Sequence, residues 1–159
     1  MEPQEIHLTQ IEQLLRPINP DRVKQKQGKF AYLETWDVIA HMDRIFGPLG
    51  WDKTVVDLQP LFQSAGENGK HSVAYRATVR VTVHTALAHK ISEDVAVGSA
   101  LNQPGLADAH DLALKSAVSD AFKRACKDLG NQFGLSLYNN GSTASVVRTS
   151  LAHPEARYK

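Results

Sequence analysis

KSAVSDAFKRACKDLGNQFG, residues 115–134, has the mixture of small apolar and charged residues that is typical of a helix packed on one side. One arc of that helix, at about 100° per residue, contains the apolar positions Leu114, Val118, Ala121, Ala125 and Leu129. The opposite arc carries the cations Lys123, Arg124 and Lys127. We therefore predict an amphipathic helix with a buried stripe and a basic exposed face.

Polar residues at both ends and on the basic face support this helix. Asp108 is a candidate N-cap, and Gly130 fits the position after the last turn. Asp120 lies three residues before Lys123 and four before Arg124, so its carboxylate can orient either cation, Arg124 by preference. On its own, such a cluster is more often a solvated face than a binding site.

The rest of the chain predicts a single α+β domain: an antiparallel three-stranded β-meander crossed by the long helix, with helices at the N-terminus. The expected elements are helices at 6–16 and 35–46, a basic loop at 22–29, and strands at 30–33, 51–62, 73–84 and 90–97. The strand at 73–84 alternates strictly between valine-rich and polar positions, which indicates one buried face. We expect a core domain at 1–138, and a linker and C-terminal segment at 139–159 that packs on the core or on a neighbouring subunit.

The composition of the chain limits the classes of function that it can have. The net charge is +1 with 42% hydrophobic and 22% charged residues, so any binding of nucleic acid must depend on local clusters. We expect no membrane segment and no secretory signal, and the single cysteine, Cys126, fits a packing role in a reducing compartment. No metal-ligand spacing, nucleophile elbow or phosphate loop occurs, so we expect no enzyme, no metal and no other cofactor.

Basic residues recur in three places. A loop contains Lys24, Lys26 and Lys29, the polar face of one strand contains Arg76 and Arg80, and the long helix contributes its own cluster. Together these cations could line one groove for a polyanion. The aromatic residues that could stack on bases are Phe30, Tyr32, Trp36 and Tyr75, although each also fits a core position.

Several stretches, in this order, resemble the Rad52 family of single-strand DNA annealing proteins. They are KFAYLETWDVIAHMDRIFGPLGW (29–51), ENGKHSVAYRATVRVTV (67–83), ISEDVAVG (91–98), ALKSAVSDAFKRACKDLGNQFG (113–134) and EARY (155–158). The resemblance implies a β-β-β-α core that assembles into a ring. It also implies a basic groove that holds single-stranded DNA by its phosphates with the bases exposed.

The resemblance also assigns site residues. The DNA-binding candidates are Lys24, Lys26, Tyr32, Lys70, Arg76, Arg80, Lys115, Lys123, Arg124 and Lys127. Lys115 and the three cations that follow it match helix positions of the family, Lys70 matches a hairpin lysine, and Tyr32 matches an aromatic of the first strand. Lys26 is the first choice for the basic residue before that strand, and Lys24 the second.

The implied function is ATP-independent binding and annealing of single-stranded DNA in recombination and repair. The implied partners are a homo-oligomeric ring and a recombinase or a single-strand-binding protein. The loop before the long helix lacks the lysines often found there, and the chain ends soon after the core, which suggests a minimal bacterial or phage type. Such a protein would be cytoplasmic and nucleoid-associated, or nuclear or mitochondrial in a eukaryote.

Three other functions remain open at this point. A module that binds double-stranded RNA or DNA has a similar order of helices and strands with a basic last helix. A metal-dependent nuclease would need paired acidic residues, and Glu93 with Asp94 is a poor candidate because neighbouring strand residues face opposite ways. An oligomeric scaffold without a nucleic-acid role is the third.

Overall fold

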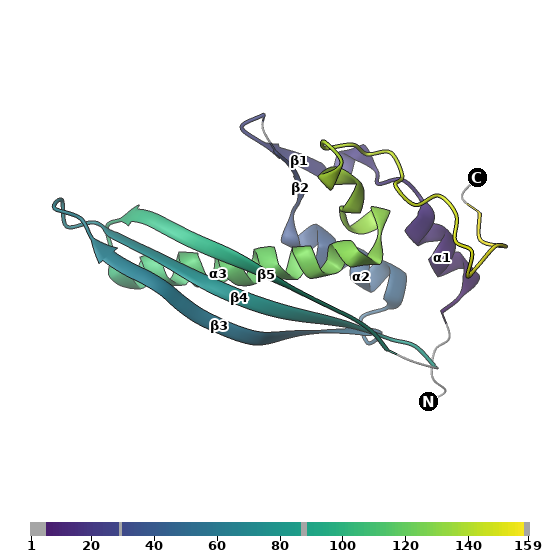
Figure 1. Cartoon of the computed structure of the whole chain (residues 1–159), viewed down its shortest axis with the longest axis horizontal. Helices are drawn as coiled ribbons and strands as arrows, with labels where there is room; N and C mark the ends of the chain where they lie inside the picture. Colours follow the sequence, from purple (N-terminus) through teal and green to yellow (C-terminus); the bar gives the residue numbers. More distant parts are fainter. Residues whose placement is uncertain (1–5, 29, 87–88, 158–159) are drawn as a thin grey trace. The chain divides into compact units, whose positions relative to one another are not determined.

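The computed structural model describes residues 6–28, 30–86 and 89–157. Its elements in chain order are α1 (Leu8–Leu15), η1 (Pro20–Arg22), β1 (Val23–Lys26), β2 (Phe30–Leu33), α2 (Thr35–Phe46), β3 (Trp51–Ala65), β4 (His71–His84), β5 (His89–Gln103), α3 (Leu106–Cys126), η2 (Lys127–Leu129), η3 (Asn131–Phe133) and η4 (Leu135–Tyr138) (Figure 1). The contacts divide the chain into two compact units. We call residues 53–81 and 92–125 the sheet unit, and residues 1–52, 82–91 and 126–159 the terminal unit.

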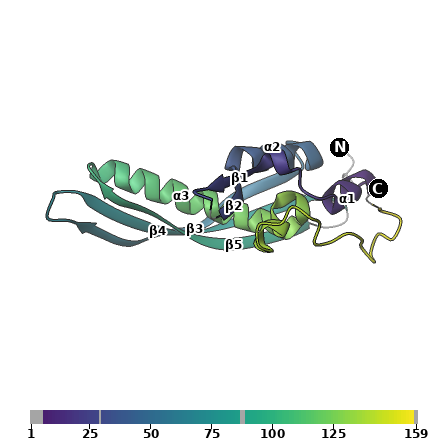
Figure 2. The ribbon, with the colours of Figure 1, turned by 90° about the horizontal axis from the view of Figure 1, so that it is seen from above.

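The sheet unit has the predicted α+β architecture. Its strands lie in the order β3-β4-β5, and short connections make them antiparallel. Helix α3 runs along one face of this sheet (Figures 1 and 2). The alternation predicted for β4 is confirmed, since Val73, Ala77, Val79 and Val81 are buried and Arg76 between them is exposed.

The contact between α3 and the sheet is closest at Gly98 of β5. A Cβ atom placed there would lie 2.2 Å from the backbone nitrogen of Ala117 and 2.5 Å from the backbone oxygen of Ala113. Both are far shorter than van der Waals contact, and both involve backbone that cannot rotate away. Only glycine therefore allows this strand and this helix to approach so closely.

The helix side of this contact is a row of alanines. Ala109, Ala113, Ala117, Ala121 and Ala125 recur every four residues, and each is fully buried. The predicted buried stripe is correct at Ala121 and Ala125. It is wrong at Leu114 and Val118, which are only partly buried. The larger side chains stand beside the stripe because the backbone of β5 leaves no room for them on it.

The strands are longer than the sequence suggested. The residues predicted to form a loop from Gly98 continue β5 as far as Gln103. Helix α3 begins at Leu106, so Asp108 lies in its first turn and does not cap it. Small residues such as Gly98 and Ala100 weakened the strand signal, yet the α3 contact needs small side chains at these positions.

The terminal unit contains a second sheet, which corrects the predicted basic loop. Val23–Lys26 pairs antiparallel with Phe30–Leu33 to form a hairpin. Gln27 and Gly28 adopt positive φ angles of 51° and 67° and begin the chain reversal. The helix expected from Thr35 to Phe46 is confirmed. Its last residue, Phe46, is buried, and its ring stacks on Phe133 with 6.2 Å between centroids.

A buried polar network around Gln132 organises the terminal unit. The Gln132 side chain donates to the backbone oxygens of Arg16 (2.9 Å) and Pro17 (2.8 Å), and its oxygen accepts from Nε2 of His41 (2.7 Å). Arg22 donates to the backbone oxygen of Gln132 (2.9 Å) and forms an ion pair with Asp37 (2.9 Å). The stretch after α1, the turn η1, helix α2 and the turn η3 are therefore tied together by Gln132 and its hydrogen-bonding neighbours.

The imidazole of His41 is neutral in this network. Burial, followed by the nearby positive charge of Arg22, lowers the pKa of His41 from 6.5 to about 4. The hydrogen bonds agree, because Nε2 donates to Gln132 while Nδ1 faces the guanidinium donor of Arg44. A proton on Nδ1 would point directly at that guanidinium.

The substitution Gly98→Ala should lower the free energy of unfolding by about 2–3 kcal/mol, because the new methyl group forces β5 away from α3. Urea unfolding followed by circular dichroism measures this loss. Gly105→Ala is the matched control, since its Cβ would meet only the flexible end of the Asp108 side chain, at 3.1 Å. Equal losses in the two variants would contradict the close contact.

Stability should fall as the pH drops from about 6.5 to about 4, because the unfolded His41 takes up a proton in this range and the folded one does not. The loss should reach about 3 kcal/mol for His41. Urea midpoints of the wild type and of His41→Gln, measured at several pH values, isolate this contribution from that of the carboxylates. A parallel pH dependence in both proteins would show that His41 titrates normally.

Candidate nucleic-acid interface

One face of the β1–β2 hairpin combines cations with aromatic rings. Lys24 pairs with Tyr32 across the two strands and Lys26 pairs with Phe30, so all four side chains share a face. We call these four residues the hairpin face. Phe30 is 71% exposed and Tyr32 is 36% exposed. Within the part of the chain that the structure describes, no carboxylate forms an ion pair with either lysine.

The hairpin explains why these residues are together. In an antiparallel pair, alternate positions point the same way, so Val23 and Leu33 turn toward the interior while the four residues of the hairpin face turn outward. A basic loop would not have fixed this spacing. Lys29, which the sequence grouped with Lys24 and Lys26, lies outside the described residues.

The sequence left the aromatic candidates undecided between core and surface, and the structure separates them. Phe30 and Trp36 are both largely exposed, the latter at 66%. Tyr75 is partly buried, and its hydroxyl group makes a 2.6 Å hydrogen bond with Nδ1 of His110 on α3. Tyr75 therefore fastens the helix to the sheet, whereas Phe30 is available to a ligand.

The cations of the long helix are held by carboxylates. Lys123 lies 3.4 Å from Asp120, and Arg124 lies 3.3 Å from Asp94 of β5. Asp120 thus orients Lys123, whereas Asp94, whose side chain is 17% exposed, anchors Arg124. These partners fix the directions of the two cations and cancel much of their charge.

Lys127 belongs to the terminal unit and begins the turn η2, after α3 has ended. Its side chain is 18% exposed and lies 3.3 Å from Asp128. The ammonium group also lies 5.7 Å from the centre of the Tyr138 ring. The sequence placed Lys127 on the exposed face of the long helix, but its side chain is mostly buried in the turn after that helix.

Arg76 and Arg80 lie on the sheet face that points away from α3. Their neighbours in β4, Val73 and Tyr75, face the helix, so the arginines face the opposite way. Each is paired with a carboxylate of an adjacent strand, at 3.4 Å in both cases. The expectation of one groove shared by these arginines and the α3 cations is therefore wrong, because the sheet stands between them.

The two remaining candidates differ in their surroundings. Lys70 lies at the exposed turn between β3 and β4, where no carboxylate of the described chain forms an ion pair with it. Lys115 is 68% exposed and pairs with Asp111 at 2.8 Å, one turn earlier on α3. Lys53, which the sequence did not suggest, lies 5.0 Å above the ring of Phe122. Only the position of Lys53 in an exposed strand could have indicated it.

Two other kinds of site are absent from the residues that the structure describes. The described residues contain no group of three or more histidines, cysteines, aspartates and glutamates arranged to hold a metal ion. Among the helices within those residues, none has the length and apolar character needed to span a bilayer.

A sequence model of the Rad52/22 family of double-strand break repair proteins matches residues 6–156, and the chain therefore belongs to that family. The match confirms the resemblance drawn from the sequence, and it includes both the hairpin face and the long helix.

The relatives to which the chain is similar are also DNA repair proteins. The chain is similar to the DNA repair and recombination protein rad22 of Schizosaccharomyces pombe, with 32% identity over 79% of this chain and 27% of that protein. It is also similar to RAD52 of Saccharomyces cerevisiae (31% identity, 88% of this chain, 30% of the relative) and to rti1 of S. pombe (28%, 91%, 39%). The chain thus spans about a third of the length of these relatives. They are fungal, so they give no support to a bacterial or phage source.

Proposed function

We propose that this chain binds single-stranded DNA and anneals complementary strands without ATP, in recombination and DNA repair. The observation that carries the proposal is the hairpin face, where two lysines alternate with two exposed aromatic rings and form no ion pair with a carboxylate of the described chain. Surfaces for single strands combine cations for phosphates with rings that contact bases. Membership of a family of double-strand break repair proteins supports the same conclusion.

The chemistry is binding without bond formation. Lysine ammonium groups neutralise phosphates and release counterions, and this interaction does not depend on base sequence. Lys123 and Arg124 add oriented donors on α3. A strand held by its backbone keeps base edges available, which lowers the entropic cost of pairing with a complement. We propose a non-enzymatic role that needs no cofactor.

We further propose that the chain acts as a homo-oligomeric ring. Both outer strands of the sheet, β3 and β5, have one edge that no other strand of the described residues pairs with. They also expose apolar side chains, including Leu61 and Phe62 on β3 and Val95 and Val97 on β5, each 47–57% exposed. Adjacent subunits would cover such surfaces. Many weak phosphate contacts around a ring would add up to strong binding.

The remaining partners follow from the family. We propose that the protein cooperates with a recombinase or a single-strand-binding protein, and that it works in the nucleus, in keeping with its fungal relatives. A module for double-stranded nucleic acid receives no support from the family match.

The double variant Lys123→Gln/Arg124→Gln should anneal complementary oligonucleotides about tenfold or more slowly than the wild type, without ATP or metal. Glutamine keeps part of each aliphatic stem, which matters because Lys123 is only 25% exposed. Stopped-flow fluorescence measures the rate, and light scattering checks the oligomer. The matched control Arg16→Ala/Lys90→Ala removes two exposed cations elsewhere and should anneal normally. Equal rates in all three proteins would exclude these helix cations.

The hairpin face can be separated into its two kinds of contact. Phe30→Ala should weaken binding of a labelled single strand by about 1–3 kcal/mol and leave the salt dependence unchanged, because a ring releases no counterion. Lys24→Ala should reduce the slope of log K against log salt by about 0.7. Fluorescence anisotropy at several salt concentrations gives both quantities. Unchanged affinity in both variants would remove the hairpin from the interface.

A further inference from the structure

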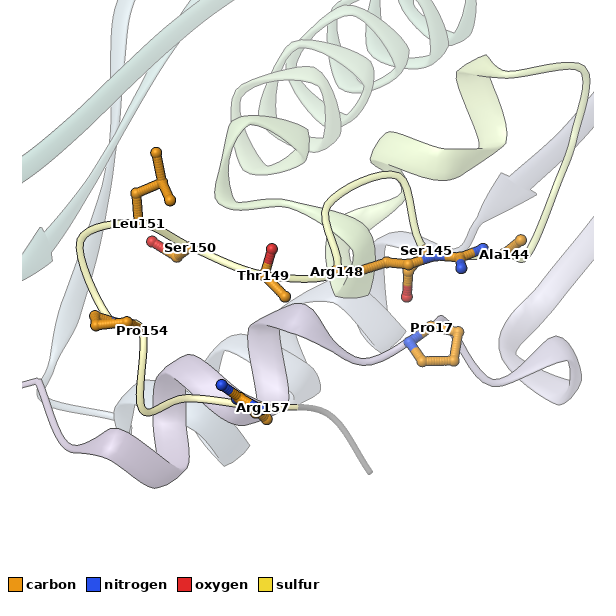
Figure 3. Close-up of a pocket in the computed structure, with 9 residues that line it drawn as sticks. All are labelled: Pro17, Ala144, Ser145, Arg148, Thr149, Ser150, Leu151, Pro154 and Arg157. Carbon is orange, nitrogen blue, oxygen red and sulfur yellow. The ribbon is translucent and has the colours of Figure 1, made fainter.

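A pocket in the terminal unit lies outside the surfaces discussed so far. It has a volume of about 670 Å³ and is formed between Pro17, which follows α1, and the C-terminal segment at 144–157 (Figure 3). The segment contributes Arg148, Thr149, Leu151 and Arg157. We propose that this pocket binds a short acidic peptide of a partner protein, with an apolar residue next to its carboxylates.

The walls of the pocket are held in place by Asn131. Its amide nitrogen donates to the backbone oxygens of Leu15 (3.2 Å) and Val147 (2.7 Å), and its oxygen accepts from the backbone nitrogens of Val146 (2.9 Å) and Val147 (3.2 Å). All four hydrogen-bonding positions of this amide are thus used. Ser145 adds a bond to Leu15 at 3.1 Å. A segment without helix or strand is therefore tied to α1 and need not be ordered by the ligand.

Two more contacts shape the outer part of the pocket. The backbone nitrogen of His153 donates to Ser150 (3.2 Å) and that of Ala156 donates to His153 (3.0 Å), which makes two consecutive turns. Ala156 is buried at 1% exposure and anchors the end of the segment beside Arg157. The fixed segment therefore presents both arginines around one opening.

The charge of the pocket selects an anion. Arg148 and Arg157 are both exposed, and no carboxylate of the described chain forms an ion pair with either one. Among the described residues that line the pocket none is acidic, whereas Ser145, Thr149 and Ser150 contribute hydroxyl groups. Two guanidinium groups with nearby hydroxyls can bind carboxylates through several charge-assisted hydrogen bonds.

The other lining residues favour a peptide over a nucleic acid. Pro17, Leu151 and Pro154 give the pocket apolar walls, and Leu151 is fully exposed in the chain alone. None of the described residues that line the pocket is aromatic, unlike the hairpin face, so they offer bases no ring to stack on. An apolar side chain flanked by carboxylates matches this combination of walls and charges.

The test uses the full chain and a fluorescein-labelled peptide in which aspartates are followed by Leu and Phe at a free carboxyl end. A second peptide replaces the aspartates with asparagines, and a third replaces Leu and Phe with glycine. Fluorescence anisotropy should show weaker binding of both altered peptides. Arg148→Ala and Arg157→Ala should each weaken binding of the acidic peptide by about tenfold. Lys90→Ala, which removes an exposed cation outside the pocket, should change it by less than about twofold.

Annealing by the same arginine variants separates this proposal from the proposed function. Rates equal to the wild type, together with lost peptide binding, would establish a peptide site distinct from the DNA surfaces. The proposal would be overturned if Arg148→Ala and Arg157→Ala both bound the acidic peptide as tightly as the wild type does. It would also be overturned if the wild type bound the aspartate and asparagine peptides equally well. A loss of single-strand binding with no effect on the peptide would also overturn it, and would assign the pocket to DNA.

Discussion

The close approach of β5 to α3 at Gly98 is the constraint on which the rest of the sheet unit depends. Backbone atoms of Ala113 and Ala117 occupy the space that any side chain at position 98 would need. The helix must therefore present alanines every four residues, and its larger residues must turn aside. The same contact brings α3 near enough to the sheet for Arg124 to reach Asp94 on β5. A packing requirement thus decides which cation of the helix is anchored and in what direction.

The terminal unit depends on polar side chains more than on apolar ones. Asn131 and Gln132 are consecutive, buried, and hydrogen-bonded to backbone atoms more than one hundred residues earlier in the chain. Amides can do this because each offers two donors and two acceptor positions, so a single buried residue replaces several backbone partners. Burial of such groups is tolerated only when these bonds are made. This explains how segments without regular structure, before η1 and after η4, are fixed against helices.

The sequence predicted the elements that carry strong periodicity. The alternating strand β4 and helix α2 were found because their residues repeat at two and at 3.6 positions. The β1 strand was missed, since VKQK contains a single apolar residue and its pairing partner is set by the turn at Gln27 and Gly28. The alanine stripe was misplaced because hydrophobicity favours Leu114 over Ala113, whereas the actual selection is for small size against Gly98. The carboxylate partners of the cations depend on tertiary contacts that no spacing reveals.

The distribution of free and paired charge bears on how a polyanion would be held. Cations on α3 and β4 have carboxylate partners, so a phosphate must compete with an existing contact, and the net gain is small at an exposed site. No carboxylate within residues 6–28, 30–86 and 89–157 pairs with the lysines of the hairpin face, so a phosphate that binds there has no such partner to displace. We infer that the hairpin face supplies affinity, whereas the α3 cations supply direction because their carboxylates hold them in position.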